Sequence, residues 1–211
     1  MISVYSERDE IRICMTNEII LFDTEFTSWE GAQERNWSGD NEYKEIIQVG
    51  AIKMNLNSGA VTETLNISIK PIFNPKLSNY IKDLTGITQK EVDNGLTLQA
   101  AVLQFLNFSS GKPVFSWGND IDVVNEDLSS KNIPIITDDN FFDLRAWIVP
   151  RYPQLGKANS GSLARLMNLD DQISGSEHDA VYDCLSQQVV LADDLKTPKD
   201  KEEFKAKFNL S

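Results

Sequence analysis

Apolar and polar positions along the chain form two kinds of pattern, which predict strands and helices in turn. Residues 19–22 form a continuous apolar run, typical of a strand that is buried on both faces. Residues 45–56 predict a second strand, and apolar residues alternate with polar ones in 61–69. The turn signal Asn57-Ser58-Gly59 separates these two segments. The first three strands should therefore form an antiparallel meander.

The rest of the chain alternates short apolar runs with segments of helical spacing. Residues 113–117 and 140–144 predict two more strands, the second of which continues into a helix. Helices are predicted at 77–84, 96–108, 121–128, 162–167 and 180–195, and the charged tail at 198–208 is helical by propensity. We find no repeat and no clear linker. We therefore divide the chain into an N-terminal extension at 1–17, one main domain at 18–196 and a C-terminal helical tail at 197–211.

Composition is that of one soluble globular domain. The 211 residues suffice to bury a core, and the apolar share of 41% and charged share of 25% are ordinary. No apolar run approaches the ~20 residues that a membrane span needs, so we expect no membrane partner. The charged residues at 7–10 do not fit a signal peptide. Cys14 and Cys184 give no disulfide framework, and we expect a cytoplasmic protein.

The formal net charge of −12 argues against a strong non-specific nucleic-acid binder, which usually carries a basic stripe. No such stripe is visible in the sequence. The acidic balance fits a short substrate that is held mainly by metal ions and a few local contacts. It fits equally a protein that never meets nucleic acid, so charge alone leaves the class of partner open.

Two carboxylates, Asp23 and Glu25, follow the first apolar run directly. Residues i and i+2 of a strand point to the same side, so both would project together from the end of a buried strand. Two such carboxylates repel each other unless cations neutralise them, and Mg²⁺ or Mn²⁺ prefer oxygen ligands. The alternative is that Asp23 is a strand-end turn residue and that Glu25 is solvated.

A second acidic pair, Asp120 and Asp122, lies just past the fourth predicted strand. If Asp120 begins a helix, the apolar residues at 121, 123, 124 and 128 fall on one helical face. Asp122 would then lie on the polar side, so we prefer Asp120 as a metal ligand. The alternative is that Asp120 only caps the helix N-terminus.

His178 is the only histidine, and therefore the only imidazole available for acid–base chemistry near neutral pH. It precedes Asp183 by five residues, which is about 140° around a regular helix, so the two would not share a face. They can meet if residues 176–179 form a loop and N-cap region and Asp183 lies one turn into the helix. The alternative is that His178 is a surface or hydrogen-bonded structural residue.

In chain order these residues resemble the three motifs of the DEDDh 3′–5′ exonucleases: Asp23-Thr24-Glu25, then Asp120 after a strand, then His178-Asp179-Ala180-Val181-Tyr182-Asp183. Further segments resemble this superfamily and its histone-mRNA-exonuclease and KapD-like branch: E-I-I-Q-V-G-A at 45–51, L-T-G-I-T at 84–88, S-W-G at 116–118 and G-S-L-A at 161–164. That branch often reads W-G-D/N-x-D near the second motif. Here residues 117–122 read W-G-N-D-I-D, so Asp122 remains the alternative ligand.

The resemblance implies an α/β fold of the ribonuclease-H-like type, with a mixed five-stranded sheet, its first three strands antiparallel, and helices on both faces. It implies that Asp23, Glu25, Asp120 and Asp183 hold two Mg²⁺ or Mn²⁺ ions and that His178 is the general base. The substrate it implies is the 3′ end of single-stranded RNA or DNA, or a short oligonucleotide, with RNA slightly favoured and nucleoside 5′-monophosphates released. It is also compatible with a homodimer, because dimers are common in this superfamily.

Substrate contacts are expected beside the acidic residues. Thr24 and Phe26 flank Glu25, and Trp29 and Trp37 lie in the long segment that leaves the same strand. A terminal base could stack on either tryptophan. The alternative is that the tryptophans pack this loop against the sheet.

Two other functions compete with the exonuclease. The first is a catalytically lapsed oligonucleotide-binding or regulatory module of the same fold, against which the complete acidic set and His178 argue. The second is a zinc-dependent hydrolase, for which one histidine and two distant cysteines are too few soft ligands.

Overall fold

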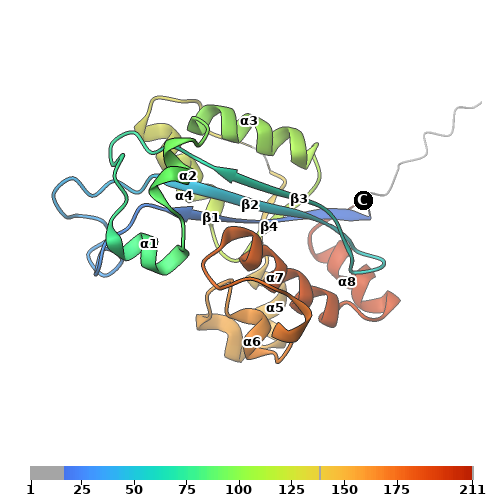
Figure 1. The fold of residues 1–211 in the computed structure, drawn as a ribbon. Coiled ribbons are helices and arrows are strands. Elements are labelled where there is room, and N and C mark those ends of the chain that lie inside the picture. The colour runs from blue at the N-terminus through green and yellow to red at the C-terminus, as the bar shows by residue number, and fades with distance from the viewer. Residues whose placement is uncertain (1–16, 138, 211) are drawn as a thin grey trace, which may run out of the picture.

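The chain folds into an α/β sandwich around one mixed sheet, and the computed structural model describes residues 17–137 and 139–210 (Figure 1). The sheet has five strands in the order β3-β2-β1-β4-β5. The strands are β1 Glu18–Phe26, β2 Ile46–Asn55, β3 Val61–Ser68, β4 Val114–Ser116 and β5 Phe141–Asp143. β1, β2 and β3 pair antiparallel, whereas β1–β4 and β4–β5 pair parallel. The predicted fold class and the predicted antiparallel meander are confirmed.

Helices cover both faces of the sheet. Figure 1 shows α3 and α4 on one side and α5, α6, α7 and α8 on the other. The α-helices are α1 Asn79–Thr85, α2 Gln89–Asp93, α3 Leu98–Ser109, α4 Asp120–Ser130, α5 Arg145–Arg151, α6 Leu163–Leu166, α7 Ala180–Asp194 and α8 Pro198–Lys207. The 3₁₀ turn η1 Pro153–Lys157 lies between α5 and α6, and the 3₁₀ turn η2 Asp170–Gln172 follows α6. Among the described helices, none combines the length and the apolar character that crossing a membrane requires.

The continuous apolar run of β1 reflects its central place in the sheet. Ile19 and Leu21 belong to the core on the α7 side, whereas Ile20 and Phe22 belong to the core on the α3 side. Successive side chains of a strand point to opposite faces, so a strand covered by helices on both sides has no polar face. β1 is thereby fixed between two cores, and its last residues are held at the edge where β1 and β4 end.

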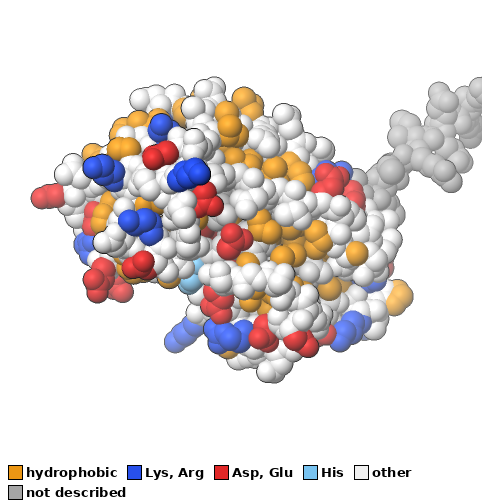
Figure 2. Space-filling view, in the orientation of Figure 1, with side chains coloured by type: hydrophobic (Ala, Val, Ile, Leu, Met, Phe, Trp, Pro, Cys, Tyr) orange, Lys and Arg blue, Asp and Glu red, His pale blue; other side chains and the backbone are white. Residues whose placement is uncertain are grey.

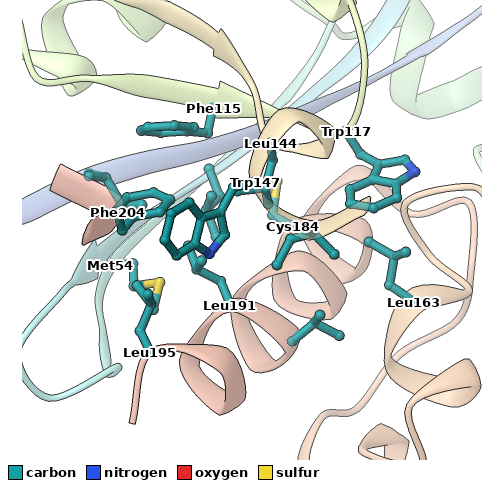
Figure 3. Packing of buried hydrophobic residues seen from close by; sticks show 14 of the residues in the cluster. Met54, Phe115, Trp117, Leu144, Trp147, Leu163, Cys184, Leu191, Leu195 and Phe204 are labelled. Carbon is teal, nitrogen blue, oxygen red and sulfur yellow. The ribbon is translucent and has the colours of Figure 1, made fainter. Parts of the chain in front are cut away.

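The tail helix α8 packs on the sheet, and the predicted helix at 198–208 is confirmed. Thr197 caps α8 by accepting from the Asp200 N–H, and Pro198 occupies the first helical position. Phe204 is fully buried beside Phe115 and Trp147, as Figure 3 shows. The proposed N-terminal extension lies, except for residue 17, outside the described residues, so the division of the chain into three parts stays a prediction.

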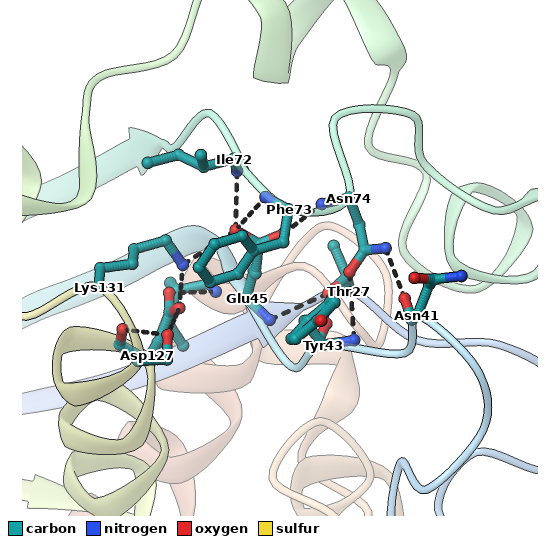
Figure 4. Close-up of polar contacts among 11 residues, drawn as sticks. Thr27, Asn41, Tyr43, Glu45, Ile72, Phe73, Asn74, Asp127 and Lys131 are labelled. Carbon is teal, nitrogen blue, oxygen red and sulfur yellow. Dashed lines mark hydrogen bonds and ion pairs between the residues drawn. The ribbon is translucent and has the colours of Figure 1, made fainter.

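A buried ionic network fixes the start of β2, close to where the loop after β1 returns (Figure 4). The carboxylate of Glu45 accepts the backbone N–H groups of residues 72–74 at 2.6–3.1 Å. Lys131 bridges Glu45, at 2.9 Å, and Asp127, which also accepts the Ile46 N–H. Burial opposes ionisation of Glu45, but Lys131 and the backbone N–H groups outweigh it and hold the pKa of Glu45 below its ordinary value. The Thr27 N–H donates to the Glu45 carbonyl oxygen at 2.8 Å, so the network anchors both ends of the 27–45 loop.

Candidate active site

Asp23 and Glu25 lie at the end of β1 in a cleft of about 430 Å³. Both carboxylates are buried, with exposed fractions of 5% and 8%. The predicted residues Asp23, Thr24, Glu25, Phe26, Asp120, His178 and Asp183 all line this cleft. A larger hollow of about 590 Å³ lies between β3 and α2, but it contains none of these residues. The cleft at the end of β1 is the candidate site because the acidic side chains converge there.

Asp120, rather than Asp122, is the acidic residue that α4 brings into the cleft. The helix begins at Asp120, and the Thr24 Oγ1 hydroxyl donates to Asp120 Oδ1 at 2.9 Å. Asn119 occupies the N-cap position, so the interpretation of Asp120 as only a helix cap is wrong. Asp122 is exposed and does not line the cleft. The parallel pairing of β1 with β4 explains the meeting, since both strands end at this edge.

His178 reaches the cleft from the loop that precedes α7. Asp179 is the N-cap of α7 and accepts from the N–H groups of Val181 and Tyr182, so the predicted loop and N-cap arrangement is confirmed. Asp183 lies one turn into the helix, and its Oδ1 accepts the His178 N–H at 3.1 Å. One potential ligand atom each of Glu25, His178 and Asp183 lie within 4.8 Å of one another. His178 could therefore act beside a metal ion or bind one.

The carboxylates perturb one another strongly. Burial, and then the charges of Asp120, Asp183 and Glu25, raise the pKa of Asp23 well above its ordinary value. Burial, and then Asp183 and Asp120, raise the pKa of Glu25 to about 9. Burial raises the pKa of Asp120 and that of Asp183 to about 6 each. Four carboxylates this close cannot all ionise at neutral pH without cations between them, so the donor set fits hard divalent ions.

Two glycines permit α7 to approach the sheet and the acidic set. A Cβ at Gly50, which pairs with Asp23 across the sheet, would lie 2.4 Å from the carbonyl carbon of Ala180. A Cβ at Gly161 would lie 2.3 Å from Asp183 Oδ1. Any larger residue at either position would push α7 or its carboxylate away, so both sites require glycine for space.

The aromatic residues predicted to bind substrate divide into two groups. Phe26 lines the cleft, whereas Trp29 and Trp37 are not among its lining residues. The Trp37 ring packs edge-on against Phe26 at 5.6 Å between centroids, and its Nε1 donates to the Thr27 carbonyl at 3.2 Å. Trp29 is half-buried. The structure thus brings Phe26 to the site and places Trp37 behind it.

Several residues of the site carry no signal in the sequence pattern. Ser160 Oγ donates to Asp183 Oδ2 at 2.8 Å, and Arg145 and Lys157 line the cleft. The motif segment at 45–51 contains Gln48, which holds the α7 N-terminus by accepting the Ala180 N–H at 3.1 Å. Each of these contacts joins residues far apart in the chain, so neither spacing nor periodicity could indicate them.

Cys184, the one cysteine in the described part of the chain, does not complete a zinc site. Cys184 is buried, does not line the cleft and lies 3.4 Å from the Gly50 carbonyl oxygen. Burial, and then the neighbouring carboxylates, raise the pKa of its thiol well above the ordinary value, which disfavours the thiolate that binds zinc. Cys14 lies outside the described residues.

A mixed sheet of this order, with carboxylates gathered from the ends of β1 and β4 and from the start of α7, defines the ribonuclease-H-like class of folds. The chain belongs to the RNase_T exonuclease family, whose model matches residues 20–187. The resemblance of the sequence to the DEDDh 3′–5′ exonucleases is thereby confirmed.

Two curated relatives share parts of the chain. It is 37% identical over 87 residues to the 3′-5′ exonuclease Snipper of Drosophila melanogaster, covering 41% of this chain and 30% of the relative. It is 31% identical over 122 residues to the probable 3′-5′ exonuclease KapD of Bacillus subtilis, covering 56% of this chain and 57% of the relative. The matched region therefore spans less than two thirds of either relative.

Two solved structures share the fold. A 3′-exonuclease recognising a histone mRNA stem-loop superposes with a TM-score of 0.70 at 17% identity, covering 85% of this chain and 82% of the other. The nuclease domain of 3′hExo, a DEDDh family member bound to rAMP, superposes with a TM-score of 0.68 at 18% identity, covering 85% and 92%. At these identities the likeness shows the fold alone.

Proposed function

We propose that this protein is a metal-dependent 3′–5′ exonuclease that releases nucleoside 5′-monophosphates from single-stranded nucleic acid. The observation that carries the proposal is the convergence of Asp23, Glu25, Asp120, Asp183 and His178 in one cleft. Family membership supports it, and so do the relatives named as 3′-5′ exonucleases.

The four carboxylates would hold two divalent ions, Mg²⁺ or Mn²⁺. When bound, such ions supply an activated water and offset the charge on the leaving 3′ oxygen. His178 would take the proton from the attacking water, because its loop lies beside Glu25 and Asp183. Thr24 and Ser160 would fix the two aspartates to which they donate, Asp120 and Asp183. Positioning and charge stabilisation would supply most of the rate.

RNA is the favoured substrate in this proposal. The support is that similar proteins act on RNA by name, namely a 3′-exonuclease that recognises a histone mRNA stem-loop and an ERI1 exoribonuclease 2 of Xenopus laevis that is 31% identical over 87 residues. Recognition of the 2′-hydroxyl distinguishes RNA from DNA. Matched RNA and DNA oligonucleotides of one sequence would measure the preference as a ratio of kcat/KM.

A labelled-end assay tests the proposed activity. With Mn²⁺, a 5′-labelled single strand should shorten stepwise, and the same strand labelled at its 3′ end should release labelled mononucleotide at once. EDTA should abolish both reactions, and Asp23→Ala should abolish them with metal present. Binding of the strand without shortening would identify a lapsed module, and shortening from the 5′ end would contradict the proposed direction.

A further inference from the structure

Arg145 is one of two cationic residues that line the acidic cleft, the other being Lys157. It is the first residue of α5, and one residue, Leu144, separates it from the end of β5. Its side chain is 42% exposed. Arg145 brings one positive charge to the cleft of the four carboxylates. A guanidinium cannot take the place of a divalent metal ion, so another role is open to this side chain.

Asp143 holds the Arg145 guanidinium in one orientation. Arg145 Nε donates to Asp143 Oδ1 at 3.0 Å and to Oδ2 at 2.9 Å, and Nη2 donates to Oδ2 at 2.8 Å. Asp143 Oδ1 also accepts the N–H groups of Gly118, at 3.1 Å, and of Arg145 itself, at 2.9 Å. The carboxylate therefore ties the loop after β4 to the end of β5 and orients the arginine.

One edge of the guanidinium is left for a ligand. Among the described residues, Nη1 of Arg145 makes no hydrogen bond or ion pair. Gly118, with φ of 115°, lies beside the group, and a Cβ there would approach Nη2 at 3.3 Å and Nη1 at 3.6 Å. The glycine thus leaves the guanidinium room at the rim of the cleft. A planar group fixed along one edge by a carboxylate is preorganised for an anionic oxygen at its free edge.

A nucleic-acid strand brings more negative charge than the metal site can compensate. Two divalent ions would only offset four ionised carboxylates, and the chain as a whole carries −12. On the face drawn in Figure 2, acidic and basic side chains are interspersed rather than gathered in a basic stripe. On this face, a phosphate beyond the reacting one would meet single cationic side chains and not a continuous basic surface. The hydrogen bonds and charge of Asp143, and then the charge of Asp120, raise the pKa of Arg145 above its ordinary value.

We infer that Arg145, oriented by Asp143, binds the phosphate one nucleotide to the 5′ side of the scissile phosphate. The inference rests on the proposed function for the identity of the scissile bond. The Arg145 side chain is 42% exposed, whereas Asp23 and Glu25 are 5% and 8% exposed, so the guanidinium lies nearer the mouth of the cleft than these carboxylates. We therefore assign it to the neighbouring phosphate and not to the reacting one between the carboxylates. Arg145 would thereby favour substrates with at least two phosphodiesters over those with one.

A trinucleotide and its analogue with a methylphosphonate at the first linkage isolate this contact, because the analogue differs only at the non-scissile phosphate, where a methyl group replaces the charged oxygen. Binding is measured by fluorescence anisotropy with Ca²⁺ in place of Mn²⁺, with intact substrate verified afterwards. The wild-type protein should bind the diester roughly 10- to 100-fold more tightly, the range for hydrogen bonds to charged groups. Arg145→Gln should bring this ratio close to one, and Arg145→Lys should retain part of it.

Lys199→Gln is the matched control, since it removes one positive charge from a side chain that is 83% exposed on α8. It should leave the wild-type ratio unchanged. Turnover of the p-nitrophenyl ester of thymidine 5′-monophosphate, which has one phosphodiester, should fall by a much smaller factor in Arg145→Gln than turnover of the trinucleotide does. A melting curve checks folding, and if Arg145→Gln does not fold, Arg145→Lys carries the same comparison.

The outcomes separate this inference from the proposed function. An unchanged diester preference in the Arg145 variants, or no preference in the wild type, overturns the inference even if the protein is an exonuclease. Equal losses on the single-phosphodiester ester would place Arg145 on the scissile phosphate and also overturn it. An Arg145-dependent preference in binding without any turnover would support the inference and refute the proposed activity.

Discussion

The carboxylate of Asp183 is held from three directions. Ser160 Oγ and the His178 N–H donate to its two oxygens at 2.8 and 3.1 Å, and Gly161 lies against Oδ1. His178 adopts a φ of 68°, which is uncommon for a residue other than glycine, and this backbone turn directs its N–H to Asp183. Each oxygen keeps lone pairs for a cation while the carboxylate is prevented from rotating.

Replacing Asp23 by Asn should abolish turnover and raise the melting temperature of the metal-free protein at neutral pH. Because burial, and then the neighbouring charges, raise the pKa of Asp23 well above its ordinary value, burying its ionised carboxylate costs stability, and an amide removes that cost. Each 1 kcal/mol regained should raise the melting temperature by about 2–4 °C. Calorimetry in EDTA and an assay in Mn²⁺ measure the two effects. Near-normal turnover of the variant would disprove the metal role of Asp23.

The two aspartates of α4 should differ sharply. Asp120→Asn should lower kcat at least ~100-fold, because the lost charge faces the cleft. Asp122→Asn is the matched control and should leave kcat near the wild-type value, since its side chain is exposed. Steady-state kinetics of both variants with one oligonucleotide gives the comparison. Defects in the opposite order would move the ligand to Asp122.

His178→Ala separates a base from a ligand. As a general base, His178 should contribute ~10²–10⁴-fold to the rate, and its loss should leave Mn²⁺ binding intact. Titration calorimetry with Mn²⁺, run beside the rate measurement, tests this directly. Because His178 also lies within ligand distance of Glu25 and Asp183, a parallel loss of Mn²⁺ affinity would reassign it as a metal ligand.

At the scale of elements, strands and long helices follow from the apolar pattern, whereas their polar ends do not. Residues 19–22 predicted the centre of β1, but the strand continues through Phe26, because residues 23–26 remain paired with β2 and their polar side chains are buried. Helix α2 was not predicted, although Thr88 and Glu91 form the capping box that marks its start. The roles of Ser160 and Arg145 arise only when distant segments meet, so one sequence could not indicate them.

The junction between β2 and α7 depends on Gln48. Its Nε2 donates to Asp179 Oδ2 at 3.2 Å and to Asn66 Oδ1 at 3.1 Å, while its Oε1 accepts the Ala180 N–H at 3.1 Å. Since Asp179 caps α7, this amide positions the turn from which His178 and Asp183 enter the cleft. A neutral donor is required there, because a carboxylate would repel Asp179.

Gln48→Glu should therefore destabilise the protein by about 1–3 kcal/mol, the cost of a lost buried hydrogen bond, and should lower kcat. Adding Asp179→Asn should restore much of the lost stability and of the lost kcat, since asparagine still caps a helix and can donate to the new carboxylate. Melting temperature and kcat of the two single variants and the double variant complete the cycle. Additive losses in the double variant would show that Gln48 and Asp179 do not act as a pair.

For the whole molecule, the acidic cleft couples stability to pH and to metal binding. The four carboxylates have ordinary pKa values near 4 when the chain is unfolded, whereas in the fold Asp120 and Asp183 rise to about 6, Glu25 to about 9 and Asp23 well above its ordinary value. The folded state thus binds more protons than the unfolded state over this range. The contribution of these four groups to stability is complete below the unfolded pKa values and is lost as the pH rises through the folded ones.

The contribution of these four groups should accordingly lower the melting temperature of the metal-free protein progressively as the pH is raised from about 4 to about 9. Mn²⁺ should reverse the trend, because it binds the ionised carboxylates of the folded state and its affinity increases as their protons leave. Melting curves in EDTA and in Mn²⁺ at each pH give the difference directly. In Asp23→Asn the decline in EDTA should be shallower, since one raised pKa is absent and the repulsion on the other three is reduced. A metal-free protein whose stability rose across this interval would show that the carboxylates do not share one buried site.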